Sequence, residues 1–203
     1  TTHFPLIIYL QSFKTYLFFN MRSIKSISII CCFLAFLTFP AFAQKASWVR
    51  LFDGKSLKGW KQMGGKARYE IEKGAITGIT VTETPNSFLV TEKEYSDFAL
   101  ELDVMIPDTT TNSGIQFRSS FNPEANNGQG RVYGFQYELD ASSRAWTGGI
   151  YDEGRRGWLY PLDLNPTAKK GYKHGVFNHV KIECRGNTIK TWINGIPASY
   201  LVD

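Results

Sequence analysis

Apolar and polar residues alternate with a period of two along several short stretches of the chain. Every second residue is apolar from Phe98 to Ile106, with Glu101 and Asp103 among the residues between. Such alternation places one side of a strand in a core and the other in water, so it predicts half-buried β-strands. Shorter alternating runs predict further strands at 115–118, 134–140, 180–184 and 189–193. Weaker patterns predict strands at 48–52, 69–72, 75–82, 87–91 and 148–151.

Turn signals separate these runs, and no helical period is found outside residues 21–43. Asn194-Gly195 is the strongest hairpin signal, because a type I′ turn needs a positive φ at both central residues. Many short antiparallel strands without helices predict an all-β fold, an antiparallel β-sandwich or jelly roll. Ser119–Gly130 and Asp152–Ala168 are the long loops in which function is expected. The strand after Gly195 reaches only Asp203, so we expect C-terminal strands beyond this sequence to close the sheet edge.

Residues 21–43 have the pattern of a signal peptide. Met21 is followed by the basic Arg22 and Lys25, a long apolar run and the small-residue motif Ala41-Phe42-Ala43. Cleavage there leaves Gln44 as the mature N-terminus, with no stable membrane anchor, and predicts a periplasmic or extracellular protein. A transmembrane anchor is the alternative, but the apolar run is short for a span of about 20 residues. Residues 1–20 precede this start, and we interpret them as upstream translation that is not part of the native protein.

Composition and charge favour one ordinary domain over residues 44–203. The full chain carries a net charge of +5, but residues 1–43 contain three basic residues and no acid. The remaining 160 residues carry +2, without a run of Lys or Arg, which argues against nucleic acid as a partner. Cys184 is the single cysteine after residue 43, so no intramolecular disulfide can form there.

Two acids on one predicted strand are the first candidates for chemistry. Glu138 and Asp140 lie two positions apart, so they share a face, with Cα atoms roughly 6.5–7 Å apart. Carboxyls at this spacing can divide acid and base roles, although a solvated strand face with two acids is the simpler alternative. Gln136 lies on the same face, and Gln116 and Arg118 lie on the polar face of another strand. Such a surface suits a sugar, and Arg118 could stabilise a developing oxyanion.

Aromatic residues follow the acidic strand. Trp146, Tyr151 and Trp158 lie in or beside a Gly-rich stretch, where flat rings could support a pyranose. The alternative is that one or two of them only fill the sandwich core. We expect at least one of Trp146 and Trp158 to line a pocket.

Other chemistries have little support in the sequence. After the leader the histidines are His174 and His179, and no third ligand follows at a spacing suited to zinc. Glu138-Leu139-Asp140 resembles part of the E-x-D-x-x-E strand of laminarinase-type glycoside hydrolases, but Ser143 replaces the third acid, so that mechanism is rejected. The sequence requires no cofactor, although a divalent cation could serve on the acidic face.

Five motifs, in order, resemble the 3-keto-disaccharide hydrolase domain family. They are residues 48–60, 112–118, 134–140, 147–151 and 194–195, so the resemblance extends from Trp48 to Asp203. It implies a concanavalin A-like lectin/glucanase sandwich that acts on 3-keto-glycosides. A C3 ketone acidifies the C2 proton, which a carboxylate can remove before the anomeric substituent leaves. On this reading Glu138 or Asp140 is the base, Arg118 stabilises the enolate, and Gln116, Gln136, Tyr151, Trp146 and Trp158 hold the sugar. A non-catalytic carbohydrate-binding module is the alternative function, because this fold hosts both.

Overall fold

The computed structural model describes residues 4–9, 13–19, 47–106, 109 and 112–203, with only the backbone described for 4–9, 13–19 and 47. Strands dominate, and the helical segments are short. The strands are β1 (Phe4–Tyr9), β2 (Phe13–Phe19), β3 (Ser47–Val49), β4 (Trp60–Gly64), β5 (Arg68–Glu72), β6 (Ala75–Ile79), β7 (Ser87–Tyr95), β8 (Phe98–Val104), β9 (Asn112–Asn122), β10 (Arg131–Asp140), β11 (Ile150–Glu153), β12 (Gly157–Tyr160), β13 (Asn178–Arg185), β14 (Thr188–Ile193) and β15 (Ile196–Val202). The helical segments are α1 (Ala125–Gly128) and the 3₁₀ turns η1 (Leu162–Leu164) and η2 (Ala168–Lys170).

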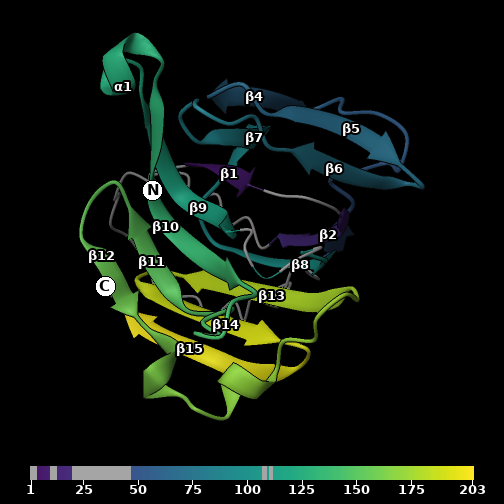
Figure 1. Cartoon of the computed structure of the whole chain (residues 1–203). Helices are drawn as coiled ribbons and strands as arrows, with labels where there is room; N and C mark the ends of the chain where they lie inside the picture. Colours follow the sequence, from purple (N-terminus) through teal and green to yellow (C-terminus); the bar gives the residue numbers. More distant parts are fainter. Residues whose placement is uncertain (1–3, 10–12, 20–46, 107–108, 110–111) are drawn as a thin grey trace, which may run out of the picture.

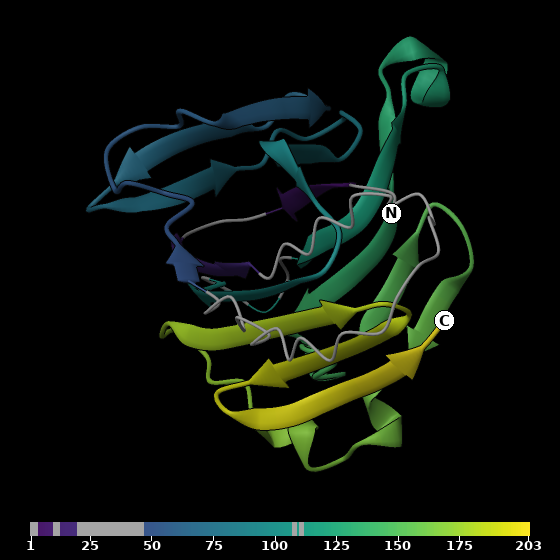
Figure 2. The same cartoon turned by 180° about the vertical axis from the view of Figure 1, so that it is seen from behind.

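Two antiparallel sheets face each other (Figure 1). The larger sheet has the order β12-β11-β10-β9-β1-β7-β4, and the second has the order β15-β14-β13-β8-β2-β3. Seen from behind, β13, β14 and β15 lie side by side as the outer layer (Figure 2). The hairpin β5–β6 forms a small separate sheet. The predicted all-β antiparallel sandwich is therefore confirmed.

The core lies between the two sheets and is filled by the apolar halves of the alternating strands. Leu100 and Leu102 on β8, and Ile115 and Phe117 on β9, are each at most 1% exposed. Tyr137 on β10 crosses this layer, and its hydroxyl donates a hydrogen bond to the Trp192 carbonyl of β14 at 3.2 Å. Residues 135, 137 and 139 of β10 therefore face the second sheet, and residues 136 and 138 face away from it.

The structure extends the strands that border the first long loop. β9 runs to Asn122 and β10 begins at Arg131, so only a short tip remains of the predicted loop Ser119–Gly130. Figure 1 shows this hairpin rising beyond the sandwich with α1 at its tip. Asn126 and Asn127 both have left-handed φ there, which suits the short side chain of Asn. Strands β4 and β12 had no alternating pattern and were not predicted.

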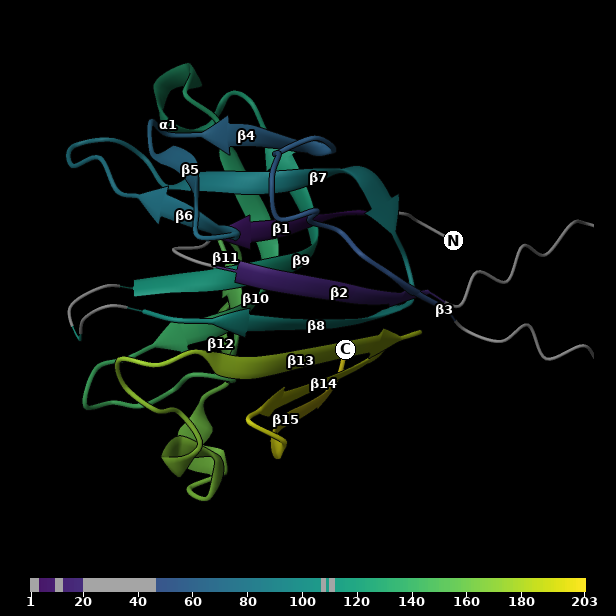
Figure 3. The ribbon, with the colours of Figure 1, turned by 90° about the vertical axis from the view of Figure 1, so that its right-hand side faces the viewer.

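Two strands come from the residues interpreted above as upstream translation. β1 pairs with β7 on one side and with β9 on the other, and β2 lies between β8 and β3. Figure 3 shows β1 beside β7 and β2 beside β8. The pairing shows where these backbones lie, and the origin of residues 1–20 stays a prediction. The predicted signal peptide, residues 21–43, lies outside the described residues.

No helix in the described part of the chain is long and apolar enough to cross a membrane.

Candidate active site

The outward face of the larger sheet carries polar and aromatic side chains that lie next to one another across four strands. The backbone register places Gln136 of β10 opposite Gln116 of β9 on one side and Tyr151 of β11 on the other. Tyr151 in turn pairs with Trp158 of β12. The strand pattern thus brings together residues that are far apart in sequence, and the two predicted acids follow Gln136 along β10.

Glu138 lies at this face with its side chain almost fully enclosed, and the residue is 3% exposed. Its Oε1 accepts a hydrogen bond from Asn112 Nδ2 at 2.8 Å, and its Oε2 accepts one from Gln136 Nε2 at 2.9 Å. Burial raises the pKa of Glu138 above its usual value, although the amides and a nearby arginine partly offset this effect. A carboxylate held in this way can take a proton near neutral pH more readily than an exposed one.

Asp140 is also buried, but its surroundings favour the ionised form. Burial alone would raise its pKa, and hydrogen bonds from Ser142 and Arg144 outweigh that effect and lower the pKa below its usual value. Ser142 Oγ donates to Oδ1 at 2.6 Å, and Arg144 Nε donates to Oδ2 at 2.7 Å. The two carboxyls therefore differ, because the pKa of Glu138 is raised above its usual value and that of Asp140 is lowered below it.

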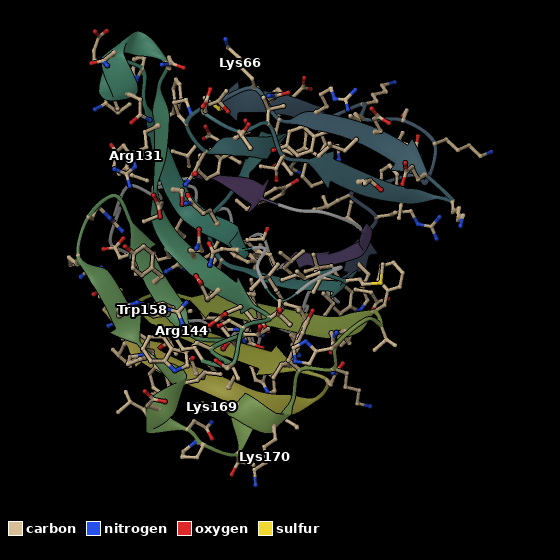
Figure 4. The ribbon with its side chains drawn as sticks, viewed as in Figure 1. Lys66, Arg131, Arg144, Trp158, Lys169 and Lys170 are labelled. Carbon is tan, nitrogen blue, oxygen red and sulfur yellow. The ribbon has the colours of Figure 1, made fainter. Side chains whose placement is uncertain are left out.

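Arg144 is a central residue of the site, and the sequence analysis missed it. It pairs with Asp140, and its Nη2 lies 3.4 Å from Glu138 Oε1. Its guanidinium carbon lies 4.6 Å from the ring centre of Trp146 and 5.0 Å from that of Trp158. The side chain is 41% exposed, so an incoming molecule can reach it. Figure 4 shows Arg144 beside Trp158.

Three aromatic rings form one wall of the site. Trp158 packs edge-on against Trp146 at 4.5 Å and against Tyr151 at 5.1 Å between ring centres. Trp146 Nε1 donates to Asp163 Oδ1, which also pairs with Lys169 Nζ. The loop that contains η1 and η2 is thereby tied to this wall. The structure thus brings Trp146, Tyr151 and Trp158 together, and their contact with a sugar stays a prediction.

Arg118 lies elsewhere. Its guanidinium donates to the carbonyls of Ser96 and Gly186 and pairs with Asp97 at 3.0 Å. Gly114 opposes Glu138 in the register, and Arg118 is four residues further along β9, or roughly 13 Å. Arg118 also has a left-handed φ of 47°, next to an irregularity in the β9–β10 pairing. The alternation that placed Arg118 beside the acids is broken at this point, so the structure does not bring it to them.

The remaining reactive side chains do not join this site. Burial raises the pKa of the Cys184 thiol to about 12, which makes it unreactive. His179 is half exposed on β13 and lies beside Asp103, while His174 packs against Tyr172. Within the described ranges no group of three or more His, Cys, Asp or Glu side chains could hold a metal ion.

Comparison with known proteins adds a family and a fold. Residues 47–203 match the sequence model of the 3-keto-alpha-glucoside-1,2-lyase-like domain. A search of curated proteins gives no match. Among solved structures, the chain is similar to a protein from Parabacteroides distasonis that carries the provisional description of glycosyl hydrolase. That similarity has a TM-score of 0.53 and 20% sequence identity, and it covers 76% of this chain and 71% of the other, so it supports the fold alone. Because the family match spans most of the sequence, this chain belongs to the 3-keto-alpha-glucoside-1,2-lyase-like domain family.

Proposed function

We propose that this protein cleaves the glycosidic bond of 3-keto-glycosides by removing the C2 proton and eliminating the anomeric substituent. The observation that carries the proposal is the arrangement at the end of β10. A buried carboxyl with a raised pKa, Glu138, lies beside a reachable cation, Arg144, that two indole rings flank. The family membership supports a carbohydrate substrate.

Each group has a defined part in this reaction. Glu138 takes the C2 proton, and the electrons of the C2–H bond form an enolate whose negative charge develops on the C3 oxygen. Arg144 stabilises that oxygen, because a positive group held in place before the reaction needs no reorganisation when charge appears. The enolate then reforms the ketone, the electron pair makes a C1–C2 double bond, and the C1–O bond breaks. The leaving oxygen keeps that bond's electrons and takes a proton, and water can add to C1 afterwards.

Asp140 is assigned a different part from Glu138. Its low pKa and its bond with Arg144 Nε keep it charged, so it orients the guanidinium toward the substrate. Trp146, Trp158 and Tyr151 would contact the apolar side of the sugar ring. Arg118 has no part in this scheme, and the role of enolate stabiliser passes from Arg118 to Arg144.

The test compares a simple aryl glucoside with its 3-keto derivative, using the full chain and following release of the aryl group. We expect release only from the ketone. Glu138→Gln should lower turnover by about 10²–10⁴-fold, because it removes the general base. Glu124→Gln, the same substitution at the exposed hairpin tip, is the matched control and should leave turnover unchanged.

Two results would count against the proposal. Full turnover by Glu138→Gln would show that another group removes the proton. Binding of both glucosides without release from either, unchanged by Glu138→Gln, would support the non-catalytic carbohydrate-binding module instead.

A further inference from the structure

Gln116 and Gln136 were expected to hold a sugar, but their amide groups bind each other and Glu138. Gln116 Nε2 donates to Gln136 Oε1 at 3.3 Å, and Gln136 Nε2 donates to Glu138 Oε2 at 2.9 Å. Gln116 is fully buried and Gln136 is 7% exposed. The three side chains therefore form a continuous hydrogen-bonded row beneath the surface of the site.

The direction of this row follows from the charge on Glu138. An ionised carboxylate can only accept hydrogen bonds, so Gln136 must present its NH₂ group to Glu138. The Gln136 carbonyl then points to Gln116, which must donate in turn. Gln116 Oε1 is left with no hydrogen-bond partner among the described residues, although it is buried. An unmatched buried acceptor costs folding free energy. The row accepts this cost at Gln116, and in return both of its amide groups donate in the direction of Glu138.

Gly114 provides the space in which Gln136 lies. Gly114 is paired with Glu138 across the two strands. A Cβ added to Gly114 would lie 2.4 Å from Gln136 Cδ and 2.5 Å from Gln136 Cγ. Gly114 does not have a left-handed φ, so its backbone does not require glycine. The missing side chain instead leaves room for the Gln136 side chain to lie over Gly114 and reach Glu138.

We propose that Gln136 is a positioning residue for Glu138, held over Gly114 and oriented by Gln116, and that this row keeps Glu138 ionised and correctly aimed. The proposal deepens the function proposed above and rests on it for the catalytic consequence alone. The charged groups that face Glu138 in the described residues are Arg144 and Asp140, and Asn112 supplies its second amide donor. None of these is altered by the substitutions below.

The test measures the ionisation of Glu138 directly, without relying on turnover. The full chain is labelled with ¹³C at the glutamate carboxyls and titrated by NMR, with the Glu138 signal assigned from Glu138→Gln. Gln136→Met keeps the length of the side chain but removes the donor. Because a donor stabilises the charged form, its loss should raise the Glu138 pKa by about one to two units. Gln62→Met, the same change at an exposed glutamine on β4, is the control and should leave it unchanged.

Gln116→Met tests the orientation step. It touches Glu138 only through Gln136, so it should raise the Glu138 pKa by less than Gln136→Met does. In a Gln136→Met background it should add nothing, because the link it acts through is already gone. The lower pKa in the pH profile of kcat/KM should rise together with the Glu138 pKa in each variant.

Gly114→Ala tests whether the space over Gly114 positions Gln136. It should destabilise the protein and raise the Glu138 pKa, because Gln136 has to move. Adding Gln136→Ala removes the clash, so the double variant should recover thermal stability while the pKa stays raised. If Gly114→Ala does not fold, the double variant and Gln116→Met still carry the test.

The outcomes separate the two proposals. An unshifted Glu138 titration in Gln136→Met and in Gln116→Met would overturn the positioning role, whether or not the enzyme turns over. A shifted titration in a protein that never cleaves a 3-keto-glucoside would keep the positioning role and reject the catalytic function.

Discussion

Two arginines, Arg118 on β9 and Arg144 in the connection between β10 and β11, have different surroundings and therefore different expected roles. Arg118 donates to two backbone carbonyls and one carboxylate, and its side chain is 15% exposed. Arg144 contacts both acids of the site, and its side chain is 41% exposed. The first joins the connection between β7 and β8 to the turn between β13 and β14, while the second can meet a substrate.

Substituting each arginine by Met should separate stability from turnover. Arg118→Met leaves the carbonyls of Ser96 and Gly186 without their donor, and should lower the free energy of unfolding by about 1–3 kcal/mol. Its kcat should be nearly unchanged at a temperature where the variant is folded. Arg144→Met should lower kcat by about 10²–10³-fold, as the loss of an oxyanion donor does, with a smaller effect on stability. Urea denaturation and turnover of the 3-keto-glucoside measure the two quantities, and the reverse pattern would contradict this assignment.

The sequence predicted that Glu138 and Gln136 share a face, but it placed the wrong arginine beside them. Alternation placed Glu138 and Gln136 on one face because β10 is regular there. The same rule failed at Arg118, because a left-handed φ interrupts β9. Arg144 lies in a connection with no period, so no pattern identified it. Its only sequence signal was a cation four residues after Asp140 and two before Trp146.

The connection from β10 to β11 shows how an irregular segment can still be held firmly. Thr147 Oγ1 accepts from the Asp140 backbone N–H at 2.8 Å and donates to the Asp140 carbonyl at 2.9 Å. The Gly148 carbonyl accepts from Thr191 Oγ1 and Ser199 Oγ of the second sheet. This clamp fixes the segment that carries Arg144 and Trp146, so the site depends on both sheets.

Gly148→Ala should loosen this clamp. Gly148 has a φ of 102°, and an added Cβ would lie 2.7 Å from the Ala198 Cβ. Backbone strain and a steric clash should together lower the free energy of unfolding by about 2–4 kcal/mol and reduce kcat through Arg144. Adding Ala198→Gly removes the clash but not the strain, so it should restore part of the stability. Thermal melts and kcat of the single and double variants measure this, and a fully stable, fully active Gly148→Ala would contradict the clamp.

At the scale of elements, burial explains which strands the sequence revealed. β8 alternates fully buried and half-buried residues, and it was predicted over its whole length. β12 is half-buried at every position and β4 has mixed exposure, so neither has a period of two. The β9–β10 extension was hidden by its Asn- and Gly-rich composition, which is typical of loops but here surrounds a tight hairpin tip.

For the whole molecule, the decisive feature is that two interior strands come from the first nineteen residues. β1 separates β7 from β9, and β2 separates β8 from β3, so each strand satisfies the backbone groups of two neighbours. The sequence predicts cleavage after Ala43, and cleavage there would remove both strands. The four strand edges would then have to be satisfied by other segments or remain unpaired.

A chain that begins at Gln44 should therefore be much less stable than the full sequence, and it should self-associate through its open edges. Native stability is only about 5–15 kcal/mol, and the loss of two interior strands should remove a large part of it. Thermal melting and size-exclusion chromatography of residues 44–203 against 1–203 measure the effect. A peptide of residues 4–19 added in trans should restore a cooperative melt and a monomer, while the same residues in scrambled order should not. If residues 44–203 alone are monomeric and melt at the same temperature as the full chain, β1 and β2 are dispensable, and residues 47–203 close both sheets by themselves.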